Sequence, residues 1–175
     1  MSERRLMQRS DKVDFIKVPA QFAGGDGAIL RMKGFTELTT SRSANTVERQ
    51  YIDEAEPTID VTSVTTSKDY DFERYINDPV HDYLADIIDN ERIGTQAVVE
   101  IYTVDFFDES ADEGRYACSR RKFTLEPASE GGDVDAYSYS GVFRVNGPLE
   151  KGYATAVEGT LPMEISEISW SEQAG

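Results

Sequence analysis

The sequence predicts a mainly β protein, an antiparallel β-sandwich or barrel flanked by a single α-helix. Segments of alternating apolar and polar residues, rich in Val, Ile, Thr, Tyr and Phe, recur along most of the 175-residue chain. Only one segment has the apolar spacing of an amphipathic helix. There is no repeat of fixed period and no regular strand–helix alternation, which argues against solenoids and parallel sheets.

The chain is long enough for one domain with its own core, which we expect over residues 14–170. A polar leader, residues 1–13, precedes this domain and is expected to be flexible. A short tail, residues 171–175, is expected to be disordered.

The first part of the domain contains short apolar runs separated by Pro19 and several glycines, which predicts two or three strands joined by turns. Thr and Ser become dense from Phe35 onward, on both sides of the breaker Pro57. β-Branched residues favour pleated backbone and hydroxyl groups keep an exposed face soluble, so long strands with one or both faces in water are expected here.

The segment "NDPVHDYLADIIDNERIG" predicts the helix, because its apolar residues recur on one face: Val80, Tyr83, Leu84, Ile87 and Ile88. Asp78 is expected to cap the N-terminus, with Pro79 in the first turn. Gly94 is expected to close the C-terminus. His81, the only histidine, is expected to be a partly exposed residue of the first turn.

The segment "QAVVEIYTVDFF" has apolar residues on both alternating faces, which predicts a strand near the centre of the sheet. Further strands are predicted in "RYACSRRKFTLEP", "AYSYSGVFRVNG", "KGYATAVEG" and "LPMEISEISW".

The charge of the chain excludes a conventional DNA-binding module. Residues 1–50 hold 9 basic and 6 acidic residues, whereas the remainder holds 9 and 27, giving the net charge of −15. Cys118 is the only cysteine, so neither a disulfide framework nor a thiolate metal site is expected, and a reducing compartment fits best. No signal peptide or membrane-spanning segment is predicted, and we expect no membrane insertion.

No catalytic residue, metal site or cofactor is predicted. His81 has no nucleophile motif to partner it. One acidic cluster offers oxygen ligands but lacks the spacing of a calcium loop, and we interpret it as a solvated hairpin tip: Asp105, Asp108, Glu109, Asp112 and Glu113. An enzyme using distant carboxylates has the least support, because no spacing selects a pair.

Two further groups of residues indicate interfaces. Arg120 and Lys122 are expected on one face of a strand and Arg121 on the other, so carboxylates of a neighbouring strand or a neighbouring subunit are the expected partners. Aromatic residues stand in several polar strands, where we expect core packing for most, with a carbohydrate platform or a subunit interface as alternatives. These are Tyr51, Tyr70, Phe72, Tyr75, Tyr102, Tyr116, Tyr137, Tyr139 and Tyr153.

An ordered series of segments resembles the major tail protein, the tail tube subunit, of long-tailed bacteriophages of Gram-positive hosts. The series is "GFTELTTS", "ERQYIDE", "YDFERYINDPVHDYLADIID", "GTQAVVEIYTVDFF" and "DAYSYSGVFRVNGPLEKGYAT", and it covers about Asp14 to Gly159. The resemblance implies a virion structural protein without catalytic residues, whose hexameric rings stack into a hollow tube around a tape-measure protein. Tail terminator and distal tail proteins are then further partners, and DNA passes through the tube during ejection. Assembly in the host cytoplasm and residence in the virion tail follow.

In such a tube, strands pair with strands of other subunits, and an acidic lumen keeps DNA from binding. Candidate lumen residues are Glu37, Asp53, Glu54, Glu56 and Asp60. The polar connection from Ser41 to Pro57, which includes Asn45 and Tyr51, is the expected stacking loop. We expect this loop to be flexible in the free subunit and to order on assembly. A monomeric carbohydrate-binding β-sandwich module is the alternative function.

Overall fold

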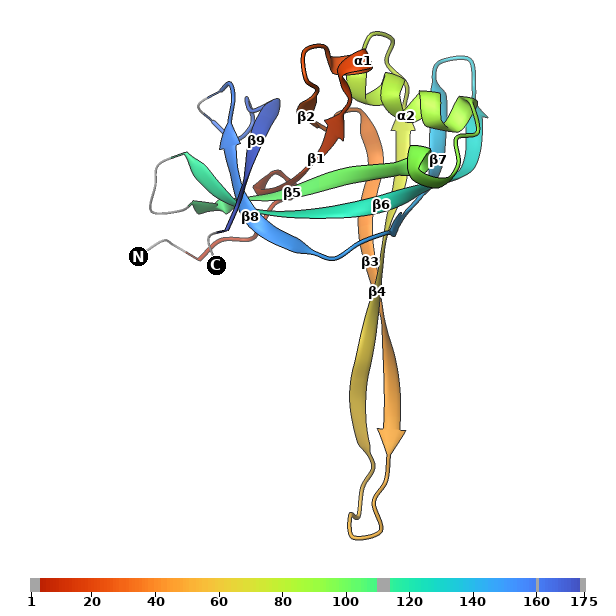
Figure 1. Ribbon diagram of the computed structural model, residues 1–175, viewed down its shortest axis with the longest axis vertical. Coiled ribbons are helices and arrows are strands. Elements are labelled where there is room, and N and C mark those ends of the chain that lie inside the picture. The colour runs from red at the N-terminus through yellow and green to blue at the C-terminus, as the bar shows by residue number, and fades with distance from the viewer. Residues whose placement is uncertain (1–3, 110–113, 160, 174–175) are drawn as a thin grey trace.

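The computed structural model describes residues 4–109, 114–159 and 161–173. Its strands form one antiparallel sheet in the order β3-β4-β7-β6-β5-β1-β2-β9-β8 (Figure 1), which confirms the predicted mainly β fold. The strands are β1 (Lys12–Val18), β2 (Ala28–Arg31), β3 (Phe35–Arg49), β4 (Thr58–Glu73), β5 (Val98–Glu109), β6 (Arg115–Gly132), β7 (Tyr137–Val145), β8 (Glu150–Ala156) and β9 (Glu167–Glu172). The helices are α1 (Ala20–Ala23) and α2 (Pro79–Asp89), with 3-10 turns η1 (Arg9–Asp11) and η2 (Gly94–Ala97).

Part of the sheet closes into a six-stranded barrel, because β8 pairs with both β9 and β6. The long strand β6 makes this closure possible, since its first half pairs with β8 and its second half pairs with β7. Apolar side chains from all six barrel strands pack together in one cluster. Its buried members include Phe15, Tyr102, Val104, Cys118, Ala154 and Ile168.

A second core lies between α2 and the strands β1, β4, β5, β6 and β7. Its members include Ile16, Tyr70, Phe72, Leu84, Ile87, Ile101 and Phe143. Strand β5 serves both cores, because Val99 and Ile101 belong to the second core while Tyr102 and Val104 belong to the barrel. The prediction that this strand is central, with both faces covered, is confirmed.

Helix α2 begins as predicted. The Asp78 carboxylate accepts hydrogen bonds from the backbone N–H groups of Val80 (2.9 Å) and His81 (3.3 Å), and Pro79 occupies the first turn. This cap satisfies two of the donors that a helix N-terminus leaves free.

The predicted end of the helix at Gly94 is wrong. The helix ends at Asp89, and Glu91 adopts the left-handed conformation with φ of 49°. The Arg92 N–H then donates to the Ile87 carbonyl, which closes the last turn without a glycine. Gly94, with φ of 61°, instead begins η2.

Both ends of the sheet extend beyond the predicted domain boundaries. Lys12 and Val13, placed in the leader, lie in β1 and pair with Asp105 and Val104 of β5. Ser171 and Glu172, placed in the tail, lie in β9 and pair with β8. The short helix α1 was not predicted and lies between β1 and β2. Cross-strand pairing thus orders these segments.

Candidate assembly surfaces

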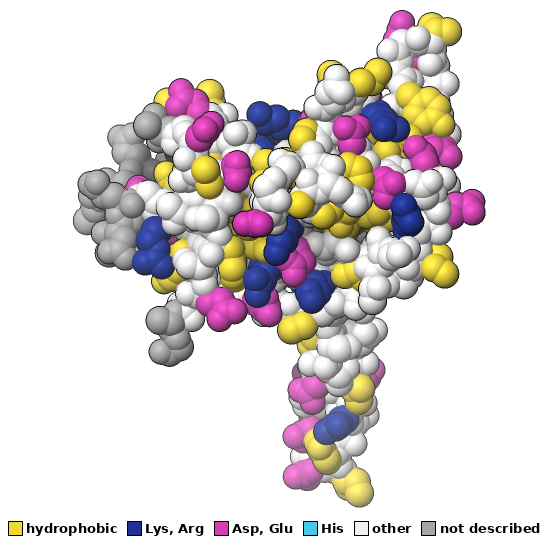
Figure 2. All heavy atoms as spheres, turned by 45° about the horizontal axis from the view of Figure 1, so that its top comes forward, with side chains coloured by type: hydrophobic (Ala, Val, Ile, Leu, Met, Phe, Trp, Pro, Cys, Tyr) yellow, Lys and Arg dark blue, Asp and Glu magenta, His cyan; other side chains and the backbone are white. Residues whose placement is uncertain are grey.

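Strands β3 and β4 form a hairpin whose outer part, residues 41–65, projects away from the rest of the molecule (Figure 1). We call this outer part the arm. Every side chain of the arm is exposed, so it has no core of its own. Figure 2 shows acidic and apolar side chains along it. An isolated two-stranded ribbon is marginally stable in water, so the arm has less internal support than the rest of the sheet, to which its root is joined.

Most of the predicted stacking loop is strand. Ser41 and Asn45 lie in β3, where they pair with Ser67 and Ser63 of β4, so the expected polar connection from Ser41 is wrong up to Arg49. The β-branched residues on both sides of the turn favour a continued ladder. Only residues 50–57, which include Tyr51 and Pro57, form the loop, called the tip below.

The hairpin presents unpaired strand edges. Among the described residues, β3 pairs with β4 alone, and β4 pairs with β7 only from Ser67 to Glu73. One whole edge of β3 and the outer edge of β4 therefore have free backbone donors and acceptors. Such an edge is a template for pairing with another chain.

A β-bulge sorts the side chains of the arm onto two faces. Asn45 pairs with Ser63 and Thr46 pairs with Val61, which leaves Thr62 as the extra residue of β4. The Asn45 side-chain amide donates to Ser63 Oγ at 2.8 Å, and Thr62 Oγ1 donates to the Asn45 carbonyl at 3.0 Å. An extra residue reverses the alternation of the strand beyond it.

The consequence of the bulge is an exposed apolar stripe. Ile59 and Val61 are brought onto the face that carries Val64, and these side chains are 64%, 61% and 51% exposed. Without the bulge, strict alternation would place Val64 on one face and the other two on the opposite face. A contiguous apolar stripe in water is typical of an interface.

The opposite face of the hairpin is acidic near its root. Glu37 of β3 stands directly opposite Asp71 of β4, and Thr39 stands opposite Asp69. Ser140 of β7 pairs with Asp71 and extends the Glu37–Asp71 row onto a third strand. None of these side chains belongs to either core. Like charges in directly opposite positions are unfavourable within the subunit, so the Glu37–Asp71 pair does not stabilise the hairpin.

The register places the five predicted lumen residues in two groups. Glu37 and Asp60 lie on this acidic face, because their cross-strand partners Asp71 and Val47 belong to it. They are ten residues apart along the ladder, which is about 33 Å. Asp53, Glu54 and Glu56 lie in the tip. Sequence reasoning missed Asp69 and Asp71, although their alternation with the buried Tyr70 and Phe72 is visible in the sequence.

The basic run of β6 divides between two faces as expected. The Arg120 guanidinium contacts Glu150 of β8 and lies 3.8 Å from Glu172 of β9, so its partners are neighbouring strands of the same chain. Arg121 points to the other face, where its Nε–H donates to the Gly147 carbonyl at 3.0 Å. Within the described part of the chain, no carboxylate pairs with Arg121 or Lys122.

His81 is fully buried, so the expected partial exposure is wrong. Its Nδ1 accepts a hydrogen bond from the Tyr75 N–H at 2.9 Å, and its Nε2 lies 2.6 Å from the Lys33 carbonyl. The first contact leaves Nδ1 without a proton, so Nε2–H is the donor to Lys33. Because both ring nitrogens are occupied, His81 links three chain segments as a structural residue.

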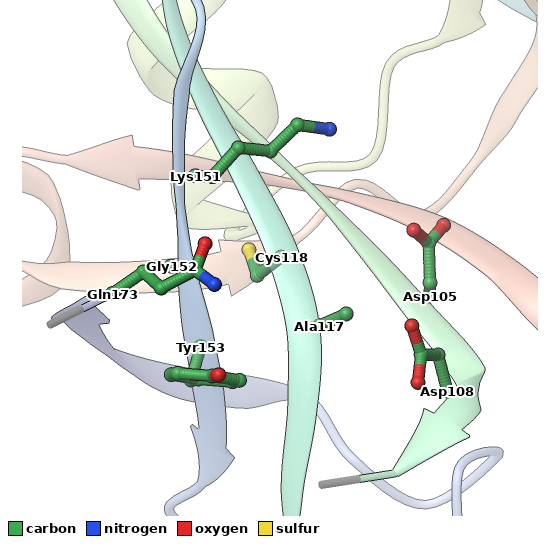
Figure 3. A pocket seen from close by; sticks show the side chains of 8 residues that line it. All are labelled: Asp105, Asp108, Ala117, Cys118, Lys151, Gly152, Tyr153 and Gln173. Atoms are coloured by element: carbon green, nitrogen blue, oxygen red, sulfur yellow. The ribbon is translucent and has the colours of Figure 1, made fainter. Parts of the chain in front are cut away.

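The pocket shown in Figure 3 lies beside β5, β6 and β8 and has a volume of about 500 Å³. Burial raises the pKa of the Cys118 thiol to about 12, so the thiol is neutral at pH 7 and a poor nucleophile. Asp105 lies on the face of the β5–β6 ladder opposite to that of Cys118, and its carboxylate is 3.4 Å from the Lys12 ammonium group. Within the described ranges, no group of three or more His, Cys, Asp or Glu side chains is arranged to hold a metal ion. Asp112 and Glu113 lie outside the described residues.

The tyrosines do not form one exposed surface. Tyr70, Tyr102 and Tyr139 are buried in the two cores. Of the exposed ones, Tyr51 lies in the tip, whereas Tyr75 and Tyr137 lie at the opposite end of the hairpin, where the Arg74 N–H donates to the Tyr137 carbonyl. A flat sugar platform needs adjacent exposed rings, so this distribution disfavours the carbohydrate-binding alternative.

A solved structure has the same architecture. A chain from the tail of an empty GTA particle, obtained with helical refinement and C6 symmetry, matches with a TM-score of 0.56 over 82% of this chain and 97% of that chain. This chain therefore shares the fold of that tail chain. The two sequences are 13% identical, a level at which the likeness concerns the fold alone. No family model and no curated protein matches the chain. Among the described residues, no helix is long and apolar enough to cross a membrane.

Proposed function

We propose that the chain is the tube subunit of a phage-type tail. Six copies form a ring, and rings stack into a hollow tube. The observation that supports this most directly is the unpaired edge of β3, continued by an arm without a core, in a fold shared with a C6-symmetric tail. The free edge of β3 on one copy and the surface that receives it on the next copy are different parts of the chain, so the contact between them is heterologous. A series of such contacts closes by rotation into a ring.

The acidic face of the hairpin root is the proposed lumen wall. Glu37, Asp69 and Asp71 recur in every copy, and a ring of such carboxylates repels the phosphates of passing DNA. This role explains why like charges stand opposite each other on a strand pair. Asp60 lies on the same face of the arm.

The other elements of the proposed function follow from the tube. The tube encloses a tape-measure protein before ejection, is bounded by tail terminator and distal tail proteins, and conducts DNA afterwards. It is assembled in the host cytoplasm, resides in the virion tail and has no enzymatic activity. The tip, residues 50–57, orders when copies assemble, since isolated loops gain order from partner contacts.

Electron microscopy of the purified full chain over a range of concentrations tests the proposal. We expect rings and tubes of constant width with an axial channel, appearing above a threshold concentration. A protein that stays monomeric in sedimentation at the highest soluble concentration contradicts it. Binding of glycans by that monomer would support the carbohydrate-binding alternative instead.

A further inference from the structure

A cationic groove lies between the root of the hairpin and the strands β1, β5 and β6. Its volume is about 440 Å³. Among the described residues, its lining includes two acidic side chains, Asp14 and Asp105, and six basic ones: Arg9, Lys12, Arg42, Lys68, Arg121 and Lys151. Such an excess of positive charge in a chain of net charge −15 indicates a specific anionic partner.

Half of these cations already have carboxylate partners. Asp14 lies 3.1 Å from both Lys68 and Arg9, and Asp105 lies 3.4 Å from Lys12.

The other three cations are Arg42, Arg121 and Lys151. Across residues 4–109, 114–159 and 161–173, no carboxylate pairs with any of them. Three positive charges that line one groove therefore remain available to a ligand.

The tip of the arm carries the complementary charge. Asp53, Glu54 and Glu56 stand within four consecutive residues, and no described basic side chain pairs with them. The exposed side chains of Tyr51 and Ile52 adjoin them. The tip is thus an anionic segment with two apolar side chains.

The tip of a chain cannot reach its own groove. Arg42 lines the groove, and β3 continues from it to Arg49 as a paired strand that spans about 23 Å. Both strands of the arm are held by the cross-strand ladder, so the tip is kept away from the body (Figure 1).

We propose that the tip of a second copy binds in this groove, where Asp53, Glu54 and Glu56 pair with Arg42, Arg121 and Lys151. This proposal rests on the proposed function and names the surface that receives the arm. Tip and groove are different surfaces, so each copy offers one of each and contacts propagate from copy to copy. The apolar stripe Ile59–Val61–Val64 lies on the face of the arm that also carries Arg42, and it is buried in the same contact.

DNA phosphate is the other anion that a cationic groove could bind. The acidic surface of the chain opposes such binding, whereas a segment of the chain itself brings three carboxylates to three free cations. The observations therefore favour the protein segment.

Carbodiimide cross-linking of assembled full-length protein tests the contact directly. A mixture of isotope-labelled and unlabelled copies is coupled, and mass spectrometry identifies peptides joined between copies. We expect links from Lys151 to Asp53, Glu54 or Glu56 between a labelled and an unlabelled chain. Assemblies whose tip carboxylates couple only to other lysines overturn the proposal.

Charge reversal provides the second test. Tip variant D53K/E54K/E56K and groove variant R42E/R121E/K151E should each raise the threshold concentration for assembly by about tenfold or more. An equimolar mixture of the two variants, or both sets of substitutions in one chain, should return the threshold to the wild-type value. R42K/R121K, which preserves charge, serves as the control. Circular dichroism and thermal melting confirm that each variant is folded.

The outcomes separate this proposal from the proposed function. If wild-type protein forms tubes and the tip variant forms them equally well, the contact is wrong while the tube function stands. If the groove variant loses binding to a duplex oligonucleotide but still assembles, the groove binds nucleic acid and the proposal is overturned. If wild-type protein never assembles, both proposals fail. Added salt should weaken the assembly of the wild-type protein but not that of the tip variant or the groove variant alone, which lack the attractive charge pairs. This result would support the contact between tip and groove.

Discussion

The ammonium group of Lys68 on β4 lies 3.1 Å from the carboxylate of Asp14 on β1, and both side chains are almost completely buried. Thr103 Oγ1 donates a further hydrogen bond to the same carboxylate at 2.8 Å. This pair joins the hairpin root to the barrel. Removing Asp14 leaves Lys68 buried without a carboxylate, and removing Lys68 leaves the buried Asp14 with only Arg9, whose side chain is largely exposed. Breaking a buried pair in this way is costly in a protein interior.

We therefore expect Lys68→Met to lower the free energy of unfolding by about 3 kcal/mol. The double variant Asp14→Asn/Lys68→Met should lose less than the two single variants combined, because no unpaired buried charge remains and Arg9, the other partner of Asp14, is largely exposed. Urea denaturation followed by circular dichroism measures both values. Additive losses would show that the two side chains do not act as a pair.

Replacing His81 by Phe keeps a ring in the core but removes both hydrogen-bonding nitrogens. The Tyr75 N–H and the Lys33 carbonyl then lose their partners, and a loss of about 3 kcal/mol in unfolding free energy is expected. His81→Gln, which retains a donor and an acceptor, should lose less. Equal stability of wild type and His81→Phe would disprove the structural role.

Gly141→Ala should destabilise the sheet by about 3 kcal/mol. A Cβ atom at this position would lie 2.3 Å from the Glu126 carbonyl oxygen and 2.6 Å from Tyr70 Oη. Gly147→Ala is the matched control, because the nearest atom to its Cβ is Lys122 Cβ at an ordinary 3.5 Å. Thermal melting compares the two, and similar melting temperatures would contradict the predicted steric conflict.

Asp71→Asn should stabilise the free subunit by about 0.5 kcal/mol, because it removes the repulsion between Asp71 and Glu37 across the strand pair. Ser140→Asn, on the adjacent strand in the same row, serves as a neutral control. A decrease in stability would show that Asp71 makes a favourable contact with a cation. In an assembled tube, the variant should retain DNA more strongly.

The Cys118 thiol should not react with a soluble disulfide reagent at pH 8 while the protein is folded, and should react at once in denaturant. The pKa of the folded thiol, raised to about 12, exceeds its ordinary value of 9, so the unfolded state loses the proton first. The stabilisation that comes from the buried, neutral Cys118 thiol is complete below pH 9 and is lost as the pH rises toward 12. Cys118→Ala should remove it, and rapid labelling of the native protein would contradict the prediction.

The sequence predicts those features of the fold that depend on local chemistry. Asp78 and Pro79 mark the start of α2 through a side-chain cap and a proline without a backbone N–H, both of which act within a few residues. The two apolar faces of β5 likewise identify a central strand. Closure of the barrel is different, because β6 changes partners from β8 to β7 along its length and no local pattern encodes this.

The assembly surfaces were only partly predictable for the same reason. The bulge at Thr62 determines which face Ile59 and Val61 share with Val64, and strict alternation gives the opposite result. The burial of His81 depends on Tyr75 and Lys33, which approach only in the folded chain. Asp69 and Asp71 could have been found from alternation, whereas the groove combines residues from η1, β1, β3, β4, β5, β6 and β8.

A three-dimensional reconstruction of the assembled protein tests the central claim most directly. It should show a sixfold ring in which the outer edge of β3 is hydrogen-bonded to a strand of the next copy, with Glu37, Asp69 and Asp71 facing the axial channel. An assembly in which that edge stays in solvent and those carboxylates face outward would contradict the account.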